Sequence, residues 1–266
     1  MTRLTVASWN VNSLKVRLPQ VLDWLSTTGV DILGLQETKL VNELFPVDAI
    51  NDAGYDVVYS GQKTYNGVAL LARRDSVTDV LGPARDLVTD LPGMDDPQRR
   101  VMVARYGDWR IVNLYVPNGQ SLESNKFLYK LDWLKALRDF VSTQIKNHAK
   151  LIVMGDFNIA PEDRDVHDPK AWAGSVLCSA PEREALMQLC SLGLVDCFRQ
   201  FEQPGQTFSW WDYRAAGFRR NRGLRIDLIL ASRDAASALT GAWVDRAPRA
   251  LERPSDHAPT VAEFTV

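Results

Sequence analysis

The stretch VMVARYGDWRIVNLY (Val101–Tyr115) decides the fold, because it contains two short strand patterns joined by a tight turn. The runs Val101–Tyr106 and Arg110–Tyr115 are rich in β-branched and aromatic residues, and they flank Gly107-Asp108. A glycine-containing turn between two such runs predicts a β-hairpin. Antiparallel pairing of neighbouring strands is therefore expected.

Similar short runs recur outward from this hairpin in both directions, bounded by Gly, Asn, Asp or Pro. They lie at Leu4–Trp9, Asp31–Gln36, Val57–Ser60, Val68–Ala72, Leu151–Met154, Ile226–Ala231 and Thr260–Phe264. A doubly wound parallel sheet needs regular alternation of strands and helices, which is missing here. The pattern instead predicts an α/β protein with two mostly antiparallel sheets packed face to face and helices outside.

Helical patterns are fewer than strand patterns. Pro19 is expected to open a helix running to about Thr27. Ser124 is expected to cap a long helix, and Ser179-Ala180-Pro181-Glu182 to form a capping box that opens a third helix ending near Leu192. The apolar face of the long helix is expected to contain Phe127, Leu131, Leu134, Leu137, Val141 and Ile145.

The size and composition of the chain indicate a single domain over residues 1–266. Hydrophobic residues make up 45% and charged residues 24%, as in globular enzymes. No apolar run approaches the roughly 20 residues of a membrane span, and the start of the chain does not resemble a signal peptide. Three cysteines without C-x-x-C spacing indicate reduced thiols, so a cytoplasmic location is expected.

Charge is unevenly distributed, although the net charge is only −2. The segment from Tyr213 to Ile226 contains no acid. It holds five arginines: Arg214, Arg219, Arg220, Arg222 and Arg225. A locally basic loop on a mildly acidic body fits a protein that contacts phosphate along one face. A solvated arginine-rich loop is an equally good explanation on charge alone.

Polar residues gather at the ends of several predicted strands. They are Asn10 and Asn12, Glu37, Tyr115 and Asn118, Asp156 and Asn158, Asp227, and Ser255-Asp256-His257. Taken singly, each has a structural explanation: Glu37 as a surface acid, Asp156 as a turn aspartate, His257 as a satisfied structural histidine. Together they predict a site at the rim of the sheets.

The chemistry of these side chains narrows the choice of metal. Carboxylates and amides without paired cysteines or clustered histidines form a hard-oxygen site, which suits Mg²⁺, or Mn²⁺ in its place. Mg²⁺ leaves coordination positions for phosphate oxygens and water, and a phosphodiester gains negative charge in its transition state. A metal ion, a histidinium and a phenol are therefore suitable groups to stabilise a phosphodiester.

Eight segments, in order along the chain, resemble motifs of the exonuclease III / AP endonuclease family within the endonuclease–exonuclease–phosphatase superfamily. They are W-N-V-N (Trp9–Asn12), L-Q-E-T-K (Leu35–Lys39), Y-N-G-V-A (Tyr65–Ala69), N-L-Y-V-P-N (Asn113–Asn118), G-D-F-N-I-A-P (Gly155–Pro161), F-S-W-W-D-Y-R (Phe208–Arg214), G-L-R-I-D (Gly223–Asp227) and P-S-D-H-A-P (Pro254–Pro259). The resemblance implies a four-layered α/β sandwich. It also implies base-excision DNA repair through 3′–5′ exonuclease, 3′-phosphatase or 3′-phosphodiesterase, and AP endonuclease activities.

The resemblance also assigns roles to residues of this chain. It makes Glu37 the principal metal ligand, helped by Asn10, Asn12 and Asp256. Asp156 and Asn158 would orient and deprotonate the attacking water. His257, held by Asp227, would contact the phosphate oxygens with Tyr115, and Asn118 would assist. Asp156, Asn158 and His257 also count among the residues expected around the metal.

The same resemblance predicts the DNA-binding residues. Trp210, Leu224 and Ile226 would form an apolar wall that accepts a base-free sugar. Tyr65, Arg214 and Arg222 would grip the duplex. The expected partner is double-stranded DNA with abasic sites, nicks or blocked 3′ ends, bound by a monomer.

The segment Asp165–Ser179 should lie beside the sugar pocket. Some family members that favour exonuclease or 3′-phosphatase activity carry a bulky residue at the position that aligns with Leu177, where AP-specialised members have a small one. We therefore expect Leu177 to narrow the pocket and to favour 3′-end processing. Dominant AP-site incision with weak exonuclease activity remains the alternative.

Two other functions fit parts of the sequence. A superfamily phosphatase acting on lipid or inositol head groups is disfavoured by the Trp210–Arg214 and Gly223–Asp227 segments. A non-catalytic DNA-binding module is disfavoured because a water-activating carboxylate beside phosphate weakens binding.

Overall fold

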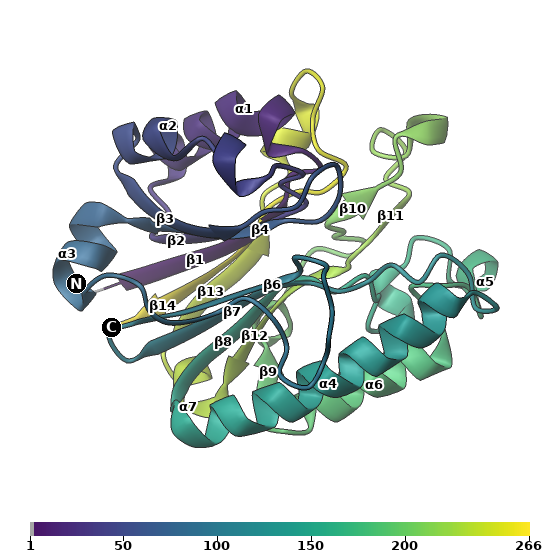
Figure 1. Cartoon of the computed structure of the whole chain (residues 1–266). Helices are drawn as coiled ribbons and strands as arrows, with labels where there is room; N and C mark the ends of the chain where they lie inside the picture. Colours follow the sequence, from purple (N-terminus) through teal and green to yellow (C-terminus); the bar gives the residue numbers. More distant parts are fainter. Residues whose placement is uncertain (1–2) are drawn as a thin grey trace.

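Two six-stranded sheets form the centre of the molecule in the computed structural model, which describes residues 3–266 (Figure 1). The predicted hairpin is present: β6 (Val101–Tyr106) pairs with β7 (Trp109–Tyr115), and Tyr106 lies opposite Trp109. The turn between them has two residues, and Gly107 adopts a φ of +55° there.

The first sheet has the strand order β13-β14-β1-β2-β4-β3. Its strands are β1 (Arg3–Asn10), β2 (Ile32–Gln36), β3 (Tyr55–Ser60), β4 (Val68–Arg73), β13 (Leu239–Val244) and β14 (Thr260–Thr265). Strands β1 and β2 run parallel, and the other neighbours in this sheet are antiparallel.

The second sheet has the order β5-β6-β7-β8-β12-β9. Its remaining strands are β5 (Arg85–Val88), β8 (Lys150–Asp156), β9 (Leu194–Asp196) and β12 (Asp227–Ser232). Here β7 and β8 are the parallel pair. A short ribbon of β10 (Trp210–Trp211) and β11 (Gly223–Leu224) extends from one end of the molecule (Figure 1). Both large sheets are mixed but mostly antiparallel, so the predicted fold class is confirmed.

Helices cover the outer faces of both sheets (Figure 1). Over the first sheet lie α1 (Leu14–Thr28) and α2 (Val47–Asp52), and over the second lie α4 (Asn125–Asn147) and α6 (Ala180–Cys190). The short helices are α3 (Asp79–Leu81), α5 (Pro169–Trp172) and α7 (Arg233–Ala236), with α3 and α5 at opposite ends of the molecule. One apolar cluster, including Ile32 and Met154, lies between the sheets. Two others pack the sheets against helices, one around Trp24 of α1 and one around Leu137 of α4. The result is four layers in the order helix, sheet, sheet, helix.

Helix α1 corrects one prediction, because it begins at Leu14 and not at Pro19. Pro19 lies inside the helix, where its nitrogen cannot donate the usual hydrogen bond to the carbonyl of Lys15. The buried side chains of Leu14, Val21 and Trp24 compensate for that lost bond by packing on the first sheet.

The other two predicted helices begin where the sequence indicates. The Ser124 side chain accepts a hydrogen bond from the backbone N–H of Lys126, and the capping box of Ser179 and Glu182 is formed. Helix α6 ends at Cys190, before Leu192. In α4, four of the predicted core residues are buried, but Leu131 and Ile145 are only partly buried. The fully buried Lys130 was not predicted.

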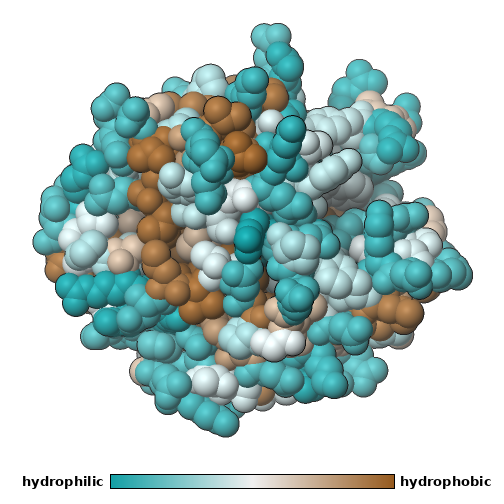
Figure 2. Space-filling view, in the orientation of Figure 1, coloured by the Kyte–Doolittle hydropathy of each residue, from teal (hydrophilic) through white to brown (hydrophobic). Residues whose placement is uncertain are grey.

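The molecular surface in Figure 2 differs from one half to the other. Apolar residues gather in a band on the left half, whereas the right half, where β10, β11 and α5 lie in Figure 1, is largely hydrophilic. Within residues 3–266, no helix combines the length and apolarity that crossing a membrane requires.

Candidate active site

Strand register brings the predicted site residues to one edge of the two sheets. Tyr115 pairs with Asp156 across β7 and β8, and Asp156 pairs with Asp227 across β8 and β12. In the other sheet, Asn10 ends β1 beside the last residue of β2, and Glu37 follows directly. Gly155 allows this arrangement, because a Cβ atom there would lie 1.9 Å from the carbonyl oxygen of Leu114.

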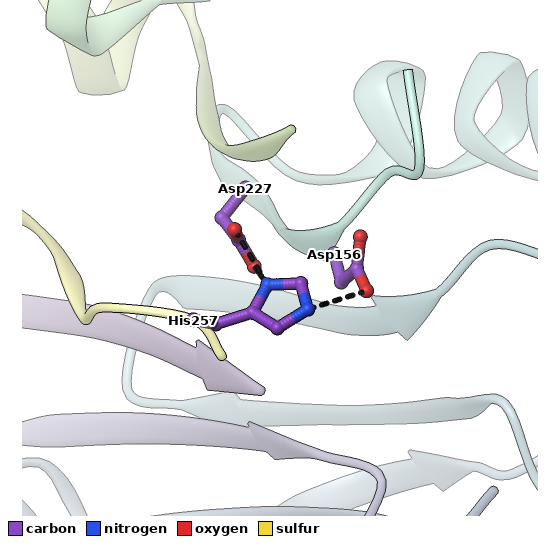
Figure 3. A group of neighbouring side chains, drawn as sticks. All are labelled: Asp156, Asp227 and His257. Carbon is purple, nitrogen blue, oxygen red and sulfur yellow. Dashed lines mark hydrogen bonds and ion pairs between the residues drawn. The ribbon is translucent and has the colours of Figure 1, made fainter. Parts of the chain in front are cut away.

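His257 lies between two carboxylates at this edge (Figure 3). Its Nδ1 is 2.9 and 3.0 Å from the two carboxylate oxygens of Asp227, and its Nε2 is 3.7 Å from Oδ2 of Asp156. All three side chains are buried. The structure therefore places Asp227 as the partner of His257, as the sequence analysis expected.

Ser209 fixes Asp227 and was not singled out from the sequence. Its hydroxyl donates to Oδ2 of Asp227 at 2.6 Å and accepts from the backbone N–H groups of Ile226 and Asp227, each at 3.0 Å. A buried carboxylate with a defined donor keeps one orientation, and so does the imidazole bonded to it. Its position in the Phe208–Arg214 segment was the available signal.

The charges of this group perturb one another. Burial raises the pKa of Asp156 above its ordinary value; the charge of Asp227 adds to this shift, while His257 opposes it. Burial alone would lower the pKa of His257, but the charges of Asp227 and Asp156 outweigh burial and raise that pKa. The geometry thus favours an imidazolium between two acids, and it makes Asp156 a stronger base than an exposed aspartate.

Amide side chains orient Asp156 further. Nδ2 of Asn10 donates to Oδ2 of Asp156 at 2.9 Å and to Oε1 of Glu37 at 3.0 Å. The backbone N–H of Asn158 donates to Oδ1 of Asp156 at 2.9 Å, and Nδ2 of Asn118 donates to Oδ1 of Asn158 at 3.1 Å. Asn10 therefore links the two sheets, because it joins the carboxylates of Glu37 and Asp156.

A second group of contacts connects Glu37 to Asp256 through Lys39 and Asn12. Nδ2 of Asn12 donates to Asp256 at 3.0 Å, and Nε1 of Trp210 donates to the other oxygen of Asp256 at 3.0 Å. The ammonium of Lys39, not predicted from the sequence, lies 2.9 Å from Oε2 of Glu37 and 2.6 Å from Oδ1 of Asn12. Positive charge is therefore stabilised beside Glu37.

The donor chemistry fits a hard divalent cation at this corner. Glu37, Asn12 and Asp256 offer carboxylate and amide oxygens, the ligands that Mg²⁺ prefers. Asp156, Asp227 and His257 also have ligand atoms within 4.8 Å of one another. Asn12, Glu37 and Asn158 all have positive φ angles, of 43°, 51° and 50°. Strained backbone of this kind is often found at functional sites.

The hydroxyl of Tyr115 is suited to donate a hydrogen bond. Burial raises its pKa well above the ordinary value, and the neighbouring charges of Glu37 and Asp156 add to the shift. The guanidinium of Arg100 lies over the ring of Tyr115, 4.7 Å from its centre, and helps to hold that ring in place. The phenol thus stays protonated beside the two carboxylates.

The predicted apolar wall is present as one cluster next to this site. Leu224 and Ile226 pack with Leu177, and the partly buried Trp210 packs against them. Trp210 also pairs with Leu224 in the β10–β11 ribbon. Leu177 is only 5% exposed and has a φ of +74°, which is unfavourable for a leucine.

The other predicted DNA-binding residues lie on the surface. Tyr65 is 67% exposed and borders a hollow of about 670 Å³ that also contains Tyr115 and Asn118. Arg214 and Arg222 are exposed. Both explanations of the basic segment place its arginines on the surface, but Arg225 is only 1% exposed.

Arg225 is held inside the protein by acids. Its guanidinium donates to Asp165 at 2.7 Å and to Asp196 at 2.8 Å, and it lies 4.8 Å from the ring centre of Phe198. Counting arginines along the sequence could not separate this inward-facing residue from its exposed neighbours.

A layered sandwich with buried acids, a histidine and amides at one edge defines a phosphoester hydrolase. The chain belongs to the Endonuclease/Exonuclease/phosphatase family, whose model matches residues 7–257. Exodeoxyribonuclease III of Haemophilus influenzae is 36% identical over 269 residues, which cover 97% of this chain and 98% of that protein. Within the family, the chain is a nuclease of the exonuclease III / AP endonuclease type.

Two solved structures resemble the whole chain. The 3′ phosphatase NExo from Neisseria, bound to a product DNA hairpin, is 47% identical with a TM-score of 0.94, covering 98% of this chain and 99% of that one. An AP endonuclease from Archaeoglobus fulgidus is 35% identical with a TM-score of 0.91, covering 99% of this chain and all (100%) of that one.

Proposed function

We propose that this protein is a Mg²⁺-dependent DNA repair phosphodiesterase that acts mainly at 3′ ends, as a 3′-phosphatase and 3′–5′ exonuclease, and less efficiently at internal abasic sites. The observation that carries this proposal is the packing of Leu177 against Leu224 and Ile226. A pocket filled by its own side chains has little room for an extruded sugar.

The chain's own residues account for the hydrolytic step. Asp156, held by Asn10 and Asn158, accepts the proton of the attacking water. The imidazolium of His257 and the phenol of Tyr115 donate to non-bridging phosphate oxygens, which gain charge in the transition state. Burial excludes bulk water from these groups and so strengthens each interaction.

Glu37 is the proposed principal ligand of Mg²⁺, with Asn12 and Asp256 beside it. When bound, the ion would supply Lewis-acid stabilisation of the phosphate charge, and Mn²⁺ would replace it. The position of Lys39 between Glu37 and Asn12 supports this assignment, because it reveals an attraction for cations in that corner.

Double-stranded DNA with blocked 3′ ends, nicks or abasic sites is the proposed substrate. Tyr65 borders the hollow that contains Tyr115 and Asn118, and it is exposed, as are Arg214 and Arg222. These three residues offer one aromatic ring and two cations for the DNA backbone. The DNA hairpin bound by the Neisseria 3′ phosphatase supports this choice. We also propose that the protein acts as a single-domain monomer in the cytoplasm.

A panel of four duplexes tests the proposal: a 3′-phosphate end, a 3′-recessed end, an internal abasic site and an intact duplex. Each is incubated with Mg²⁺ and again with EDTA. We expect the highest kcat/KM at the 3′-phosphate end and no reaction in EDTA. Preferred incision at the abasic site would instead establish the AP endonuclease alternative, which the similarity to the Archaeoglobus fulgidus enzyme favours. Activity that persists in EDTA would refute metal dependence.

A further inference from the structure

Lys130 is a lysine with no access to solvent in the second turn of α4. Its ammonium has three N–H bonds, and each has a partner. It donates to the carbonyl oxygen of Asn158 at 2.7 Å and to that of Asn118 at 3.2 Å, and the third bond is to Oε1 of Glu182. Two of these acceptors belong to loops that carry candidate catalytic side chains.

Glu182 is as buried as Lys130, and both of its carboxylate oxygens accept hydrogen bonds. Besides Lys130, Oε1 accepts from the backbone N–H of Leu177 at 3.0 Å. Its other oxygen accepts from the backbone N–H and the hydroxyl of Ser179. The capping box that begins α6 therefore also holds the peptide nitrogen of the residue that closes the apolar pocket.

The pair joins two parts of the site that are otherwise far apart in the chain. On one side, Asn118 and Asn158 are bonded to each other and, through the backbone of Asn158, to Asp156. On the other side, Leu177 is held in a left-handed conformation, with its N–H on Glu182 and its carbonyl on the N–H of Ala160. A leucine does not adopt this conformation without such support.

We propose that the buried ion pair of Lys130 and Glu182 holds the loops of Asn118 and Asn158, which contact phosphate, in a fixed position relative to the pocket wall at Leu177. The pair thereby sets the choice between 3′-end processing and abasic-site incision. Neither residue touches DNA in this scheme. Because the scheme refers to these two reactions, it rests on the function proposed above.

An apolar pair of similar volume would fill the same space but could not perform this task. It would leave two carbonyl groups and the N–H groups of Leu177 and Ser179 without partners in a dry environment. Packing alone therefore does not explain the pair. The distinction gives the test, because a purely structural role and a positioning role predict different behaviour of the double variant.

Four variants separate the two roles. Glu182→Gln keeps the shape and removes the charge, and Lys130→Met removes the ammonium. The double variant Lys130→Met/Glu182→Leu replaces the pair with apolar side chains, which often restores stability. Leu137→Ala is the matched control, because Leu137 is buried in the same helix within the cluster that packs the second sheet.

We expect the first three variants to lower kcat at a 3′-phosphate end on the order of 10²-fold with KM for DNA nearly unchanged, as displacement of reacting groups by about 1 Å would do. Their ratio of 3′-phosphatase to abasic-site activity should also change. Leu137→Ala should lower only the unfolding temperature. Measurements are made well below the unfolding temperature of each variant.

Recovery of wild-type kcat and substrate ratio in the double variant would overturn the positioning role, and so would an unchanged ratio in Glu182→Gln. If the single variants do not fold, the double variant alone decides. The four-duplex panel with the wild-type protein tests the proposed function independently of these variants. If the wild type prefers abasic sites, the proposed function fails, and the variants are compared on that substrate instead.

Discussion

Replacing Leu177 by glycine would open the pocket wall at its most crowded point. Two energetic effects oppose each other in this variant. Removing a buried leucine side chain costs about 2–5 kcal/mol. Releasing a left-handed φ of +74° should return about 1–2 kcal/mol, because glycine adopts that conformation readily. The net loss should be roughly 0–4 kcal/mol, a fall in Tm of at most roughly 16 °C.

The same variant should also change the preference between the two substrates. Losing one apolar obstacle in a pocket is worth on the order of 10–100-fold in discrimination. We therefore expect the ratio of abasic-site incision to 3′-phosphatase activity to rise by about that factor. The assay is kcat/KM on two duplexes that differ only in the lesion, combined with thermal unfolding of the same preparations.

Two control variants make the outcome specific. Leu177→Met keeps the volume of the side chain and should leave the ratio unchanged. Leu186→Ala removes a buried leucine from the far side of α6, where it packs in the cluster with Leu137, and should lower Tm alone. A Leu177→Gly protein that is destabilised but has the wild-type ratio would refute the idea that Leu177 governs lesion choice.

Four variants test the proposed chemistry and the basic segment. Asp156→Asn should lower turnover by about 10²–10⁴-fold while DNA binding is retained; near-normal turnover would mean that Asp156 is not the base. Glu37→Gln should raise the Mg²⁺ concentration needed for half-maximal rate, and an unaltered metal titration would remove Glu37 from the metal site. Arg222→Ala should lower the slope of log affinity for DNA against log salt concentration by about one unit. Arg225→Met should instead destabilise the fold by about 3–5 kcal/mol, because Asp165 loses a buried partner. If chemical denaturation showed an unchanged stability for Arg225→Met, and binding titrations showed the salt effect in that variant, Arg225 would reach DNA.

The inner strands of both sheets and the edge strand β3 could be predicted from the sequence, whereas the edge strands β5, β9 and β13 could not. β6 and β8 have continuous apolar patterns because the inter-sheet core and α4 cover them. β5 is mostly exposed, and β13 contains a register shift between Leu239 and Gly241. Neither has a regular alternation that a pattern could reveal, and β9 has only three residues.

For the candidate site, residue types and order were predictable, but the contacts between them were not. Carboxylates and amides after strands indicated a polar edge, and the family resemblance joined His257 to Asp227. Nothing local distinguished the inward-facing Lys130 and Arg225 from solvated cations. Their burial depends on acids about 30 to 60 residues away, namely Glu182, Asp165 and Asp196, and periodicity within one element carries no information about such distant partners.

The pairing of β1 with β14 has a consequence for synthesis of the protein. These strands begin and end the fold, yet they lie side by side, and the residues just beyond β1 and just before β14 enter the same site. Asn10 leaves the ribosome early, whereas Asp256 and His257 emerge some 240 residues later. A nascent chain therefore lacks the imidazole of His257 and the strand that pairs with β1 until β14 is translated, so the candidate site can be assembled only when nearly the whole domain has been made.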